Sequence, residues 1–184
     1  MTDFAVEHLP SPLVDAARVV GGYVWLEERL FETLGGWAPS VTEAGVKLHL
    51  DADSHHHAWH ASLWRQRLPA LRELPSEEFV APASPAAEAL VAALHMSSTT
   101  IERLVGIYRV LLPRQVARYQ RHRERASAIT DGPTIRALDL ILADELDDWR
   151  RGEFLVQQLL RSPEAVERAS AHQAALETLA VRDR

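Results

Sequence analysis

Four long stretches of this chain place apolar residues every three or four positions, which is the repeat of an amphipathic α-helix. They run from residue 11 to about 34, from about 42 to 68, from about 100 to 126 and from about 133 to 161. No stretch of useful length alternates apolar and polar residues, as a half-buried β-strand would. The pattern therefore predicts an all-α fold.

Residues that favour helix ends stand at the borders of these stretches. Ser11-Pro12 combines an N-cap residue with a proline in the first turn. Thr99 and Glu102 have the spacing of a capping box at the start of the third stretch. Pro113 lies inside that stretch, where its missing N–H leaves the carbonyl of Arg109 without its helical partner. We therefore expect a kink or bulge just before Pro113.

The connections between the stretches fit a bundle of four helices. Short turns join the first pair and the last pair, whereas the proline-rich segment 74–85 and a short helix at 85–95 separate the second stretch from the third. A crossover of this length carries a chain from one end of a bundle to the other. We predict one domain over residues 1–184, an up-down four-helix bundle with its core at about 11–161 and a short C-terminal helix at about 163–181.

Three of the four stretches carry acidic residues within the apolar stripe. Glu27 does so in the first stretch, Asp53 in the second, and Glu145 in the fourth, with Asp148 close to it one turn further on. Carboxylates gathered in an apolar core repel one another and lose their water, so they need a cation or shared protons. A divalent metal ion would meet that need.

The second stretch is also rich in histidine. Its candidate ligands follow one another at intervals of four, three and four residues, and therefore share one helix face: His49, Asp53, His56 and His60. His55 and His57 lie about 100° to either side of His56, so the three consecutive histidines cannot all face one point. Of the three, we choose His56 as the ligand.

The composition excludes several classes of site. The chain has no cysteine, which rules out thiolate zinc sites, iron–sulfur clusters and cysteine nucleophiles. A net charge of −6 argues against a nucleic-acid interface, which normally has a basic excess. The first residues lack the pattern of a signal peptide, and no apolar run reaches membrane-spanning length. We therefore expect a cytoplasmic protein with no membrane or nucleic-acid partner.

These acidic and histidine positions resemble those of the ferritin-like superfamily of di-iron or di-manganese carboxylate bundles. In that family the first and third helices each supply a glutamate, and the second and fourth each supply Glu-x-x-His. The matching positions are Glu27, Asp53-Ser-His-His56 and Glu145-Leu-Asp-Asp148. The chain departs from the family in having Asp53 for glutamate, Asp148 for histidine and no matching glutamate on the third helix. The resemblance implies iron or manganese as the cofactor, as one or two ions.

Two functions from different classes fit this pattern. One is a non-haem iron or manganese oxidoreductase or hydroxylase that acts on a small molecule, with Tyr108 and Tyr119 as candidate catalytic residues. Its candidate metal ligands are Glu27, Asp53, His56, Glu145, Asp148, His60 and His49. The other is a degenerate, metal-free ferritin-like scaffold that binds a small molecule or a protein. A homodimer is also expected, since the last helix has an apolar face.

Zinc-dependent hydrolysis or isomerisation is a weaker third alternative. It would use His49, His56 and His60 directly. These histidines lie on consecutive turns of one straight helix, and such side chains converge poorly on a single ion.

Overall fold

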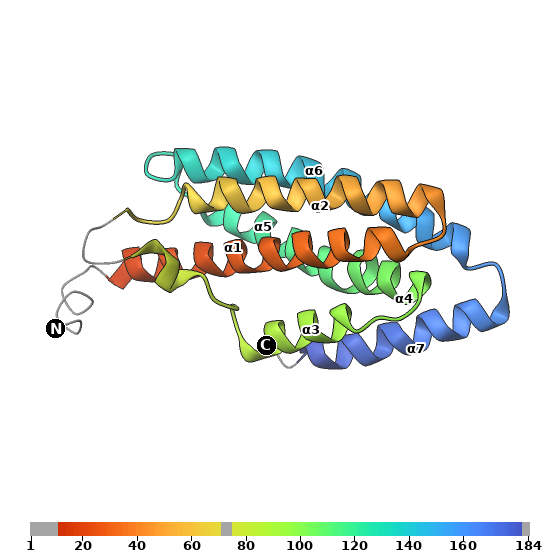
Figure 1. Ribbon diagram of the computed structural model, residues 1–184. Coiled ribbons are helices and arrows are strands. Elements are labelled where there is room, and N and C mark those ends of the chain that lie inside the picture. The colour runs from red at the N-terminus through yellow and green to blue at the C-terminus, as the bar shows by residue number, and fades with distance from the viewer. Residues whose placement is uncertain (1–10, 71–74, 182–184) are drawn as a thin grey trace.

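The computed structural model describes residues 11–70 and 75–181, and its regular structure over these residues is entirely helical (Figure 1). The longer helices are α1 (Ser11–Trp37), α2 (Ala44–Arg65), α6 (Gly132–Leu159) and α7 (Pro163–Ala180). The shorter ones are α3 (Pro85–His95), α4 (Thr100–Val105) and α5 (Leu112–Arg125). Single turns of 3₁₀-helix occur at η1 (Ala38–Ser40) and η2 (Ser76–Phe79). None of the helices in the described part of the chain is long and apolar enough to cross a membrane.

The third long stretch forms α4 and α5 with a π-helical segment, η3 (Gly106–Leu111), between them. Its start is the predicted capping box, because the Thr99 side chain accepts a hydrogen bond from the backbone of Glu102 and the Glu102 carboxylate accepts one from the backbone of Thr99. The segment η3 ends one residue before the first turn of α5, which contains Pro113. Of the two irregularities expected before this proline, a kink or a bulge, the structure has the bulge.

Figure 1 shows how the helices are arranged. Helix α1 packs along α2 and runs antiparallel to it, and α6 packs against α2, α4 and α5. Helices α2 and α5 run in the same direction, because the chain returns along the molecule through η2 and α3 before α4 begins. Helices α3 and α7 pack against each other, and α7 also packs against α4 and η3. The C-terminal helix is thus part of a second layer beneath the long helices.

The core consists of two apolar clusters with a polar layer between them. The first cluster includes Leu30, Leu50, Leu104 and Val156. The second includes Val24, Trp64, Tyr119 and Ile141. Where the long helices pass from one cluster to the other they carry buried polar residues, namely Glu27, Asp53, His57, His60, Gln115, Glu145 and Asp148. The acidic residues predicted for the core face are therefore buried in it.

Candidate metal centre

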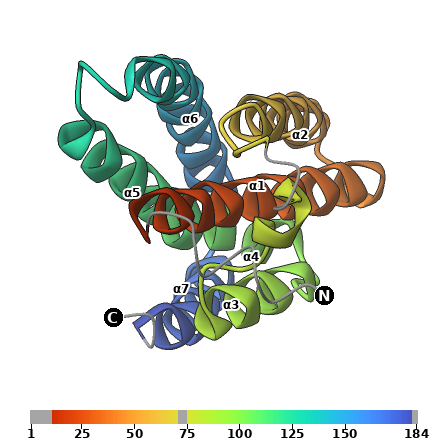
Figure 2. The same cartoon turned by 90° about the vertical axis from the view of Figure 1, so that its left-hand side faces the viewer.

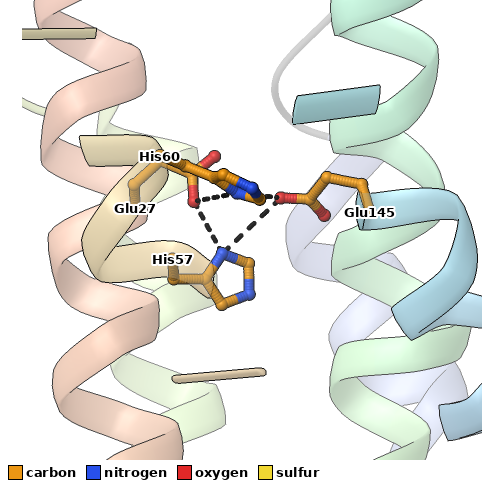
Figure 3. Close-up of side chains that lie close together, drawn as sticks. All are labelled: Glu27, His57, His60 and Glu145. Atoms are coloured by element: carbon orange, nitrogen blue, oxygen red, sulfur yellow. Dashed lines mark hydrogen bonds and ion pairs between the residues drawn. The ribbon is translucent and has the colours of Figure 1, made fainter. Parts of the chain in front are cut away.

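Four buried side chains from three helices point at one place in the polar layer: Glu27 of α1, His57 and His60 of α2, and Glu145 of α6 (Figure 3). Each offers one possible ligand atom, and these atoms all lie within 4.8 Å of one another. His57 Nδ1 is 2.6 Å from Glu27 Oε2 and 3.5 Å from Glu145 Oε1. His60 Nδ1 is 3.6 Å from the same Glu27 oxygen and 3.2 Å from the same Glu145 oxygen.

The nitrogen–oxygen separations are close to those of a metal site. Ligand atoms placed about 2.1 Å from an ion in tetrahedral geometry stand about 3.4 Å apart. The four nitrogen–oxygen distances, from 2.6 to 3.6 Å, lie around that value. We call Glu27, His57, His60 and Glu145 the four-residue centre.

Each histidine of the centre has a further carboxylate behind it. His57 Nε2 lies 3.3 Å from Asp53 Oδ1, and His60 Nε2 lies 3.2 Å from Asp144 Oδ2. Metal-binding histidines usually contact a carboxylate, carbonyl or water through the ring nitrogen that faces away from the ion, which fixes the ring and raises its basicity. His60 makes such a contact as a hydrogen bond with Asp144, whereas His57 Nε2 and Asp53 are paired by charge without a hydrogen bond.

The two tyrosines hold carboxylates of the layer. The Tyr108 hydroxyl donates to Asp53 Oδ2 over 2.6 Å, and the Tyr119 hydroxyl donates to Glu27 Oε1. Tyr119 in turn accepts a hydrogen bond from Trp64 Nε1. Burial and the neighbouring carboxylates raise the pKa of both tyrosines well above the usual value, so both hydroxyls keep their protons and act as donors. Glu27 is thus held through one oxygen and directs the other towards the centre.

Glu145 differs from the other acids of the layer. Its carboxylate is buried, and neither oxygen has a hydrogen-bond partner among the described residues. Burial and the charge of Glu27 raise the pKa of Glu145, which means that the fold disfavours its ionised form. A buried carboxylate without a hydrogen bond is costly, and only its ion pairs with the two imidazoles offset that cost here. A cation between the carboxylate and the two Nδ1 atoms would satisfy it. The residues therefore fit a metal ion.

Without a metal, protonated histidines offset the charge of the buried carboxylates in the polar layer. Burial opposes ionisation of Glu27, but the charges of His57 and His60 outweigh it and lower the pKa of Glu27 to about 2. Burial likewise lowers the pKa of His60, but Glu145 and Glu27 raise it to about 10. Asp53, Glu145 and Glu27 raise the pKa of His57 well above its usual value in the same way. At neutral pH both histidines of the metal-free protein are protonated and balance the buried carboxylates.

The inward histidine of the run 55–57 is His57 rather than His56. His57 is fully buried, whereas the His56 side chain is 39% exposed and bonds Asp148 Oδ2 through Nδ1 over 2.6 Å. Six of the nine buried positions of α2 follow one another at alternating steps of four and three: Val46, Leu50, Asp53, His57, His60 and Trp64. The choice of His56 depended on extending the stripe to Leu63, whereas the buried residue is Trp64, which shifts the inward face by about 100°. A search for the heptad-like spacing that ends at Trp64 would have found His57.

The remaining sequence-predicted ligands lie beside the four-residue centre. His49 is buried, its ring is 5.3 Å from that of Tyr108, and its Nε2 has no hydrogen-bond partner among the described residues. Asp148 is buried with His56 as its hydrogen-bond partner, and burial together with the charge of Asp53 raises its pKa. Asp53 contacts the centre through His57.

No protein-family model matches the chain, and searches of curated proteins and of solved structures found no match either.

Proposed function

We propose that this protein is a ferritin-like bundle that binds one divalent iron or manganese ion at the four-residue centre. The observation that carries the proposal is the buried Glu145 carboxylate, which makes no hydrogen bond among the described residues and lies 3.5 Å from His57 Nδ1 and 3.2 Å from His60 Nδ1. The carboxylates behind His57 and His60 support it, because they prepare both rings as ligands. The parallel course of α2 and α5, with the long return between them, supports the ferritin-like assignment.

The ligand chemistry favours iron or manganese. Imidazole and carboxylate without sulfur suit these ions, and two histidines with carboxylates are a common set in non-haem iron oxygenases. Iron or manganese bound here would supply redox chemistry with dioxygen. We therefore propose that the protein is an oxidoreductase or hydroxylase that acts on a small molecule. Tyr108 and Tyr119 would serve it by holding Asp53 and Glu27 in place as hydrogen-bond donors that keep their protons.

One observation favours the alternative of a metal-free scaffold. Protonated His57 and His60 already balance the carboxylates of the layer, so the protein can fold without an ion. In that case the layer would be a structural network, and the bundle would bind a small molecule or a protein partner.

The experiment that separates the two is iron loading followed by dioxygen uptake. Metal-free protein is mixed with one equivalent of Fe(II) without air, and dioxygen consumption is then measured with an electrode. We expect the wild-type protein to consume dioxygen faster than the same amount of free Fe(II), and His57→Gln to lose this effect. The matched control is His55→Gln, since His55 is exposed and, among the described residues, bonds only the carbonyl of Asp51. A wild-type protein that binds iron without consuming dioxygen would contradict the oxidoreductase proposal, and one that binds no iron would favour the scaffold.

A further inference from the structure

Helix α1 begins and α5 ends at the end of the molecule that faces the viewer in Figure 2, away from the four-residue centre. A cleft of about 480 Å³ opens there between side chains of these two helices and of the chain after α2. This volume is within the range of small-molecule sites. None of the residues that line the cleft belongs to the four-residue centre.

One wall of the cleft is apolar and belongs to α1. Val20 and Tyr23 are buried at its base, whereas Leu13 and Val19 are 39% and 48% exposed along its edge. The Tyr23 hydroxyl is fixed by a 3.2 Å hydrogen bond with His122 Nδ1. This wall offers contact to the apolar body of a ligand.

The opposite wall is strongly basic. Arg118, Arg121 and Arg125 follow one another at helical spacing on α5, and Arg67 reaches the cleft from the chain after α2. Only two acids, Asp15 and Asp131, also line it. Four arginines against two aspartates make this cleft locally basic in a chain whose net charge is −6.

Most of these guanidinium groups lack an internal partner. In the described part of the chain, Arg67, Arg121 and Arg125 make no side-chain hydrogen bond or ion pair. Asp131 is engaged elsewhere, because its carboxylate accepts hydrogen bonds from the Ser127 backbone and the Thr130 hydroxyl. Guanidinium groups without an internal partner are available to a ligand oxyanion, which accepts paired, charge-assisted hydrogen bonds from them.

From this geometry we propose that the cleft binds an organic oxyanion, a phosphate or carboxylate attached to an apolar body. Arg67, Arg121 and Arg125 hold the oxyanion, and the apolar wall of α1 holds the body. The site is independent of the metal centre, so it stands whether or not the protein binds a metal.

The test is isothermal titration calorimetry with 1-naphthyl phosphate, which combines both parts of the ligand. Inorganic phosphate and 1-naphthol are the two separate halves, and 1-naphthoate distinguishes a carboxylate from a phosphate. We expect at least one of naphthyl phosphate and naphthoate to bind at least about tenfold more tightly than inorganic phosphate or 1-naphthol, because both walls of the cleft then contact the ligand. A ligand that binds no more tightly than inorganic phosphate would overturn the proposal.

Variants place the binding in the cleft. Arg121→Gln and Arg125→Gln should each weaken binding of the tighter ligand about tenfold, the loss expected for one charge-assisted hydrogen bond. Val19→Ser should also weaken it by removing apolar contact. The matched control is Arg123→Gln, since Arg123 lies on the same helix but pairs with Asp139 at 2.7 Å. His57→Gln should leave the affinity unchanged. Equal affinities for the wild type, Arg121→Gln and Arg125→Gln would overturn the proposal.

Discussion

At the scale of single residues, the centre depends on a carboxylate, that of Glu145, which the metal-free fold pairs with two histidines but supplies with no hydrogen bond among the described residues. Glu27 receives hydrogen bonds from Tyr119 and His57, whereas Glu145 receives none in the described structure. The pKa of Glu27 is accordingly low and that of Glu145 is raised. Such a difference between two neighbouring acids is typical of functional sites, where stability is given up for binding.

This contrast predicts the effect of Glu145→Gln. The amide removes a buried charge and its repulsion with Glu27. The free energy of unfolding of the metal-free variant should therefore equal that of the wild type or exceed it by about 1 kcal/mol. Urea denaturation in the presence of a chelator measures this. Glu32→Gln, at an exposed position of α1, is the control. Destabilisation of Glu145→Gln by more than about 1 kcal/mol would show that the ionised carboxylate stabilises the fold.

The histidines predict how the stability of the metal-free protein depends on pH. The pKa of His60 is raised from 6.5 to about 10 in the folded state, so the stability that its proton contributes is complete below pH 6.5 and is lost as pH rises towards 10. Glu27 acts in the opposite sense, because its pKa of about 2 means that its contribution is lost as pH falls below 4.5. Urea midpoints should therefore be highest between about pH 4.5 and 6.5 and should fall at alkaline pH. A midpoint that rises steadily from pH 6.5 to 10 would contradict this.

Metal binding should show the reverse dependence. His57 and His60 must lose their protons before their Nδ1 atoms can bind an ion, so the metal affinity should increase from pH 6.5 towards 10. Calorimetric titration with Mn²⁺ in two buffers of different ionisation enthalpy would count the protons released. We expect between one and two protons for each ion, and release of none would mean that the histidines do not bind the metal.

At the scale of helices, the sequence predicted where helices occur and where they end better than which side of each helix points into the core. The periodic stretches, the capping box at Thr99 and the bulge before Pro113 all follow from local chemistry, and the structure contains them. The inward face of α2 depends on which apolar residue its neighbours cover, and three consecutive histidines make neighbouring registers equally plausible. Asp144 could not be placed behind His60 for a similar reason, because that contact joins two helices.

The segment η3 positions Tyr108 against α6 at a place where only glycine fits. A Cβ added to Gly152 would lie 2.3 Å from two atoms of the Tyr108 ring. The close approach lets the Tyr108 hydroxyl reach Asp53, which in turn contacts His57. Gly152 therefore helps to position the centre from a distance.

This predicts that Gly152→Ala is destabilising. The displaced ring should cost about 1–3 kcal/mol of unfolding free energy, as overpacking does in other cores, and should weaken Mn²⁺ binding by disturbing Asp53. The control is Gly36→Ala, because a Cβ there meets nothing within 4 Å and alanine favours the helix. Thermal unfolding and calorimetry measure the two effects. If both variants behave alike, the close approach at Tyr108 has no role in the centre.

At the scale of the whole molecule, the fold places a polar layer between two apolar clusters. The acids of α1 and α6 could be assigned to this layer from the sequence, because each interrupts an apolar stripe. The packing of α3 against α7 could not be predicted from the sequence, because it depends on contacts between segments that are far apart along the chain. The basic cleft was also hidden in the sequence, because Arg67 is distant along the chain from the arginines of α5.

The most direct test of the central claim is elemental analysis by plasma mass spectrometry after exposure to iron, manganese and zinc. We predict about one equivalent of metal for each wild-type chain, as expected for a single four-ligand site. His57→Gln and Glu145→Gln should lose the metal, whereas His56→Gln should keep it, because His56 lies outside the four-residue centre. Circular dichroism would confirm that each variant is folded. A folded wild-type protein that takes up none of the three metals, or a loss of metal in His56→Gln alone, would contradict the assignment.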